Sequence, residues 1–180
     1  MKQNTYKSLL LKNLDNNGVQ ATETESLILN KNAFGIRLYL SREENVIANG
    51  KQINSFFIQS AYAISRMCPP EYIYSPIDSI ISIRVFTLNN FDDQHPENSD
   101  ITDYFKVAQS YSAVKEHIAK MRFTYKHGYG YNSKPFEKEL KIDLMLMTAP
   151  TTNNPYQFKI QVTLSDRRIF EQKTTEIQLI

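Results

Sequence analysis

The densest group of residues able to do chemistry is an acidic stretch at positions 92–103. Five carboxylates stand there with no lysine or arginine between them: Asp92, Asp93, Glu97, Asp100 and Asp103. Hard cations such as Ca²⁺ take about six to eight oxygen ligands, which clustered carboxylates can supply. The spacing is not that of an EF-hand loop, however. We therefore expect a solvated turn without a bound metal, and the weak candidates for a cation site are Asp92, Asp93 and Asp100.

Asp100 has a second reading as a capping residue. A short apolar segment follows it, and its carboxylate can accept a hydrogen bond from the backbone N–H of Thr102 or Asp103. The negative charge also suits the positive end of a helical turn. This reading predicts that Asp100 has a structural role.

A second candidate is an aromatic loop at positions 125–131, where tyrosines surround Gly128 and Gly130. A tyrosine offers a flat apolar face with a polar tip, which suits stacking on a sugar or a peptide group. Because glycines weaken a strand, we expect Tyr129 and Tyr131 to be partly exposed and to bind a glycan, a peptide or a second copy of the chain. The alternative is a hairpin whose tyrosines pack back on the sheet.

A third candidate is nucleophilic, with the single cysteine, Cys68, beside His95, His117 or His127. Catalysis would need a thiolate within hydrogen-bond reach of a base. Nothing in the sequence brings these residues together, and a cysteine followed by two prolines is typical of a small buried hydrophobe. No phosphate-binding glycine loop, zinc-ligand pair or serine elbow is present.

These observations favour a protein without a cofactor and without catalytic activity. The alternative is a hydrolase acting on glycans or peptides, with carboxylates of the acidic stretch as acid and base. An enzyme should hold at least two of these carboxylates in a concave pocket with perturbed pKa values. A binding module should present a flat or loop-built surface.

Composition narrows the possible class of protein further. A chain of 180 residues with 41% apolar side chains is long enough for one domain with a full core. A net charge of +2 gives no electrostatic footprint for nucleic acid. No apolar run approaches the roughly 18 residues that a spanning helix needs. The short apolar run at positions 9–11 does not make a secretory signal, and a single cysteine excludes an internal disulfide.

The elements that must position these residues are mostly strands. Residues 79–88 alternate as a central strand, with Ile81, Ile83 and Val85 on one face. Residues 34–40 alternate as cleanly, and the turn signal at positions 15–18 predicts a hairpin between 6–14 and 20–30. The only good helix candidate is 112–121, with Ser112 as its cap.

The last third of the chain predicts three strands joined as an antiparallel meander, at 140–146, 156–164 and 169–180. A bulge or bend near Thr174 and Thr175 would bring Phe170, Ile177 and Leu179 into one core. Seven or more strands with one short helix predict an all-β fold, an antiparallel β-sandwich of immunoglobulin-like type. We expect one domain over residues 1–180, with 1–33 as an N-terminal hairpin or arm and 34–180 as the main sandwich.

Two stretches carry a family resemblance. The segment 100–105, Asp-Ile-Thr-Asp-Tyr-Phe, follows Thr-Leu-Asn-Asn-Phe-Asp at 87–92, and the chain ends with the strands 158–166 and 174–179. From about Phe34 onward the chain resembles an uncharacterised family of exported, lipoprotein-type proteins from Bacteroides and relatives. Similar sequences often place glycine at the position of Arg167, in an Asp-Gly turn.

The resemblance implies a place in the cell envelope. Family members typically begin with a signal peptide and a lipid-modified cysteine, neither of which stands in this sequence, so the lipid anchor is expected outside it. The implied role is binding or surface assembly, with an unknown glycan, peptide or protein as partner and the chain as a monomer or weak dimer. The resemblance carries no activity, so it assigns no functional residue.

Overall fold

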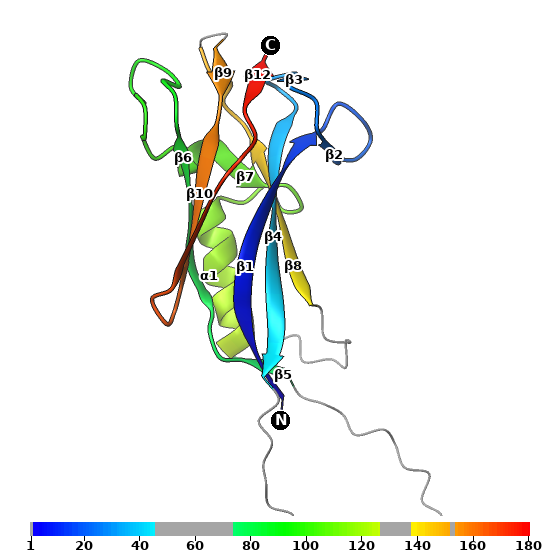
Figure 1. Ribbon diagram of the computed structural model, residues 1–180, viewed down its shortest axis with the longest axis vertical. Helices are drawn as coiled ribbons and strands as arrows, with labels where there is room; N and C mark the ends of the chain where they lie inside the picture. The colour runs from blue at the N-terminus through cyan, green and yellow to red at the C-terminus, as the bar shows by residue number, and fades with distance from the viewer. Residues whose placement is uncertain (1, 46–73, 127–137, 152–153) are drawn as a thin grey trace, which may run out of the picture.

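The computed structural model describes residues 2–45, 74–126, 138–151 and 154–180. Figure 1 shows an elongated molecule in which two sheets face each other and one helix packs along their side. The strands are β1 (Lys2–Asp15), β2 (Thr22–Thr24), β3 (Ile28–Leu29), β4 (Phe34–Asn45), β5 (Tyr74–Pro76), β6 (Ile80–Thr87), β7 (Phe105–Val107), β8 (Glu139–Leu146), β9 (Pro155–Tyr156), β10 (Phe158–Leu164), β11 (Ile169–Lys173) and β12 (Ile177–Leu179). A 3₁₀ turn, η1 (Thr102–Tyr104), and the helix α1 (Val114–Lys126) complete the described part.

Two sheets form the sandwich. The larger has the order β2-β1-β4-β8-β7, with β5 beside β1, and the smaller has the order β11-β10-β6. A third, short sheet of β3, β12 and β9 closes one end. Pairing is antiparallel except between β1 and β5 and between β12 and β3. The predicted all-β, sandwich-like fold with one helix is therefore confirmed.

Alternating apolar side chains form the core between the sheets. On β4, every second residue from Phe34 to Leu40 is at most 1% exposed, and the same holds on β10 from Phe158 to Leu164. A strand points successive side chains to opposite faces, so this alternation puts one face inward and leaves the other to polar residues. Phe34 and Phe158 stack across the two sheets with ring centroids 5.4 Å apart.

The predicted helix is confirmed, with different limits. It begins at Val114 and runs to Lys126, so Tyr125 belongs to the helix and not to a hairpin. Val114 and Ile118 are buried, and the helix packs against β6 and β7. The hydroxyl of Ser112, the expected cap, lies 2.7 Å from that of Ser110.

The strand predicted at 79–88 exists as β6, but it lies at the edge of its sheet and is not central. The chain that returns after the acidic stretch covers the free edge of β6. The N–H of Ile101 donates to the carbonyl of Val85 at 2.8 Å, and the N–H of Thr87 donates to that of Ser99 at 3.1 Å. A loop thus forms the backbone hydrogen bonds that a second neighbouring strand would form if β6 were central.

Ile81 was expected in the core and is 42% exposed, whereas Ile80 is 3% exposed. The cause is a bulge. Thr163 of β10 pairs with Ser82, but Leu164, the next residue, pairs with Ile80, so Ile81 has no residue opposite it. One extra residue exchanges the two faces of a strand. The remaining members of the expected core group, Ile83, Val85, Phe158, Ile160 and Val162, are buried in one cluster.

The predicted meander is wrong at its first link. β8 pairs with β4 and β7 in the larger sheet, whereas β10 and β11 belong to the smaller one. The chain crosses between the sheets after β8, as connections in sandwiches commonly do. The break expected near Thr174 is confirmed: it separates β11 from β12, and both Ile177 and Leu179 are buried.

The hairpin between β10 and β11 contains a strained residue. Arg167 has φ 72°, the left-handed region that side chains with a Cβ avoid. We expect Arg167→Gly to raise the free energy of unfolding by about 1 kcal/mol, since glycine adopts this φ without strain. Urea denaturation measures the change. The same substitution at Lys173, an exposed strand residue with ordinary φ, should instead destabilise, and an equal effect at both positions would contradict the prediction.

Candidate binding site at the loop end of the sandwich

Three segments that lie far apart in the sequence meet at the end of the molecule where the C-terminus lies (Figure 1). They are the acidic loop, which we define as residues 89–99, the start of β9, and the link between β11 and β12. Gln157 joins them: its N–H donates to Asn89 Oδ1 at 2.9 Å, and its Nε2 donates to the carbonyl of Thr174 at 2.9 Å. The loops are therefore fixed to the rigid core, as in many binding sites.

A shallow, open groove of about 370 Å³ lies between these segments. This volume is near the lower end of the range for small-molecule sites, roughly 300–1,000 Å³. We call it the end groove and define it by its lining residues, Leu88, Asn89, Asn90, Glu97, Asn154, Pro155 and Glu176. Its lining is mainly polar, with two carboxylates and three side-chain amides.

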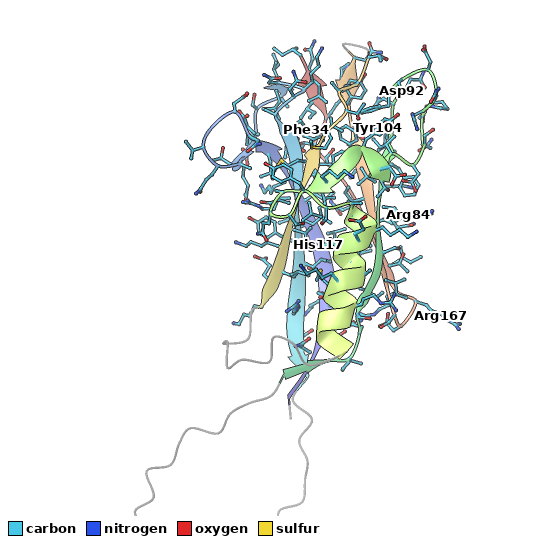
Figure 2. All side chains as sticks on the ribbon, turned by 180° about the vertical axis from the view of Figure 1, so that it is seen from behind. Phe34, Arg84, Asp92, Tyr104, His117 and Arg167 are labelled. Carbon is cyan, nitrogen blue, oxygen red and sulfur yellow. The ribbon has the colours of Figure 1, made fainter. Side chains whose placement is uncertain are left out.

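A hydrogen-bonded cluster holds the base of the acidic loop. His95 Nδ1 lies 2.7 Å from Asp92 Oδ1, and the Tyr104 hydroxyl donates to Asp92 Oδ2 at 3.2 Å. The backbone N–H groups of Gln94 and His95 donate to Asp92 Oδ1 at 2.9 and 2.8 Å. Figure 2 shows Asp92 and Tyr104 near each other at the loop end. This cluster closes the loop on itself and on η1.

The cluster sets the charge state of Asp92. Burial raises the pKa of its carboxyl, but hydrogen bonds from the His95 ring and from the N–H groups of Gln94 and His95 outweigh burial, and the pKa lies below its ordinary value of 3.8. A carboxyl with a lowered pKa is a poor general acid.

This lowered pKa predicts a pH-dependent stability. A depressed pKa in the folded state contributes stability above the unfolded value, and that stability is lost as the pH falls through the folded value. Asp92→Asn should lower the free energy of unfolding by about 1 kcal/mol at pH 7. The difference from the parent should vanish on acidification through the lowered pKa. The exposed neighbour Asp93 is the control: Asp93→Asn should change little at any pH. A stability difference between Asp92→Asn and the parent that persists in acid would contradict this prediction.

The other acidic side chains are engaged with protein groups or point to solvent. Asp100 accepts from the N–H of Thr102 at 3.0 Å, as expected, and lies 3.2 Å from Arg84 Nε. The N-cap position of η1 is nevertheless Ile101, and no side chain makes a capping hydrogen bond there, so Asp100 is not the cap. Asp93 is exposed. In the described part of the chain, which includes all of 92–103, no three His, Cys, Asp or Glu side chains are placed to hold a metal.

Of the remaining candidates, only His95 and His117 lie within the described residues. Cys68, His127, Tyr129 and Tyr131 lie outside the described residues. His117 lies on α1, apart from Asp92 and Tyr104 (Figure 2). Burial, followed by the charge of Lys120, lowers the pKa of His117. The described histidines thus do not share a site.

Comparison with known proteins gives one match. Residues 6–175 match a family described as Domain of unknown function (DUF5034). The chain belongs to the DUF5034 family. The match begins at Tyr6 in β1 and ends just after β11. The DUF5034 domain therefore includes both main sheets of the sandwich and the acidic loop. The expected membership in a family without an assigned function is confirmed.

No curated protein and no solved structure matches the chain. In the described residues of this DUF5034 domain, no helix is long and apolar enough to cross a membrane.

Proposed function

We propose that this DUF5034 domain is a non-catalytic binding module of the cell envelope that acts through its loop end. The observation that carries the proposal is the end groove, which three separate segments build on a rigid sandwich. Loops positioned in this way are the usual place of binding surfaces. Location in the envelope, through a lipid anchor outside these residues, is supported by the resemblance of residues 87–105 and 158–179 to exported lipoproteins.

A non-catalytic role is favoured over hydrolysis by the carboxylates of the acidic stretch, residues 92–103. Of its carboxylates only Glu97 lines the end groove. Asp92 is tied to His95 and Tyr104, and Asp100 to Thr102 and Arg84. Glycoside hydrolysis needs a pair of carboxyls across the substrate, one of them with a raised pKa. The hydrogen bonds at Asp92 act in the opposite direction.

Arrays of glycans and peptides test the binding role. We expect the parent domain to bind at least one class of ligand, and Asn154→Ala, an exposed change at the groove, to weaken that binding. The bound ligand should be recovered with unchanged mass after long incubation. Binding to no ligand of either class would overturn the proposal. Cleavage that Asp92→Asn abolishes would replace it with a hydrolase.

Localisation has its own measurement. An antibody raised against this domain should detect it in the membrane fraction of the cells that produce it, and detergent but not high salt should release it. Recovery in the cytoplasmic fraction would contradict the envelope location. The binding role would still be tested separately by the glycan and peptide arrays.

A further inference from the structure

The residues that line the end groove restrict which class of ligand can bind there. Its two carboxylates come from different segments, Glu97 from the acidic loop and Glu176 from the link before β12. No lysine or arginine is among its lining residues. Among the described residues neither carboxylate forms an ion pair, although Asn98 Nδ2 donates to Glu97 Oε1 at 3.3 Å. The groove therefore offers strong hydrogen-bond acceptors that face solvent.

The asparagines of the groove add donors with a defined orientation. Asn89 Oδ1 accepts from the N–H of Gln157 at 2.9 Å, and Asn90 Oδ1 accepts from the N–H of Glu97 at 3.0 Å. A backbone N–H can only donate, so these contacts fix which end of each amide is the oxygen. The Nδ2 group of each asparagine then remains as a donor, and neither has a partner among the described residues.

Fixed donors beside fixed acceptors select a particular ligand chemistry. A hydroxyl both donates and accepts, so neighbouring hydroxyls can donate to Glu97 or Glu176 while accepting from the asparagine amides. Lysine and arginine side chains only donate, so they would offer no acceptor to the Nδ2 groups. An anionic ligand would meet two negative charges. Leu88 and Pro155 supply apolar surface for C–H groups.

We infer that the end groove binds a neutral saccharide through vicinal hydroxyl groups. This inference rests on the proposed binding function and names its ligand class. The shallow groove accepts a terminal or exposed sugar unit. Binding at such an open site involves few contacts, so the affinity comes mainly from hydrogen bonds to Glu97, Glu176 and the asparagine amides.

The test is a titration of the purified domain, followed by NMR or calorimetry, with three probes. They are neutral hexose oligosaccharides, oligosaccharides of the same length that carry uronic acids, and a peptide rich in arginine and lysine. We expect binding of a neutral oligosaccharide and weaker binding of its acidic counterpart. The double variant Glu97→Ala/Glu176→Ala should weaken binding at least about tenfold, as expected for the loss of charged acceptors.

A matched control keeps the result specific. Glu116→Ala/Glu139→Ala removes two exposed carboxylates elsewhere, on α1 and β8, and should leave the affinity unchanged. Thermal melting of each variant verifies that the domain stays folded. Saccharide binding that survives Glu97→Ala/Glu176→Ala would overturn the assignment of the groove but not the binding role. Preference for the basic peptide would overturn only the assignment of the ligand as a saccharide. If none of the three probes binds, this inference is overturned, and the glycan and peptide arrays still decide whether the domain binds a ligand at all.

Discussion

Ile160→Ala should lower the free energy of unfolding by about 2–5 kcal/mol. Ile160 is fully buried in the middle of β10, between Val85 of β6 and Gln172 of β11. Truncation removes apolar surface from the core and leaves a cavity that the rigid sheets on either side fill only in part. Chemical denaturation at pH 7 measures the loss, with the slope of the transition unchanged.

The chain offers a control with the same chemistry. Ile169 lies on the neighbouring strand β11 and is 54% exposed, so Ile169→Ala should change stability by no more than about 0.5 kcal/mol. Ile160→Val, which deletes one methyl group, should cost about 0.5–1.5 kcal/mol. A denaturation midpoint for Ile160→Ala close to that of the parent would show that β10 is not the centre of the core.

Strands with one buried face were predictable from sequence. On β4 and β10, apolar residues alternate with polar ones over a full strand length, and only a half-buried strand has that period. The helix was found for the same reason, because Val114 and Ile118 repeat at helical spacing. These signals are local, since each depends on the environment of a single element.

The wrong predictions concern contacts between a strand and distant parts of the chain, which the local sequence pattern does not contain. The bulge at Ile81 depends on the register with β10, and the edge position of β6 depends on a loop that replaces a strand. Likewise, β8 pairs with a strand about a hundred residues earlier in the chain. Sequence alternation specifies which side chains face inward, but it does not specify which sheet a strand joins.

The end groove was missed for a related reason. Asn89 and Asn90 read as ordinary turn residues, and Glu176 stands in a link with no distinguishing pattern. Their chemistry depends on Gln157, whose two hydrogen bonds bring the acidic loop and the β11–β12 link together. The run of acidic residues was the stronger signal in the sequence, yet of its five carboxylates only Glu97 lines the end groove.

A buried ion pair between the two sheets was also not foreseen. The Asp78 side chain is fully buried and pairs with Arg168, whose side chain is 41% exposed. Asp78 also accepts from Thr5 Oγ1 at 2.7 Å and from the N–H of Tyr6 at 3.3 Å, while Arg168 Nη1 donates to the carbonyl of Tyr6 at 2.7 Å. The network connects β1 with Asp78, two residues before β6, and with Arg168, the residue before β11.

Removing the arginine from this network should have a large effect. Arg168→Ala leaves a buried carboxylate without its cation, which typically costs about 3–5 kcal/mol, and we expect the lower end because Thr5 and Tyr6 still donate to Asp78. Asp78→Ala should cost less, about 1–3 kcal/mol, since the partly exposed Arg168 can turn to solvent and the main loss is the acceptor for Tyr6 N–H. The order of the two variants follows from which partner is buried.

A double-mutant cycle isolates the pair itself. Because each single variant leaves a partner behind, Asp78→Ala/Arg168→Ala should destabilise by less than the sum of the two single changes. Arg167→Ala is the control: that side chain is exposed, lies next in the chain and takes no part in the network, so the variant should match the parent. Urea denaturation of the parent, the two single variants and the double variant supplies the cycle, and Arg167→Ala is measured beside them. An Arg168→Ala protein as stable as Arg167→Ala, or strictly additive losses, would mean that the pair does not hold the sheets together and that hydrophobic packing alone stabilises this end of the sandwich.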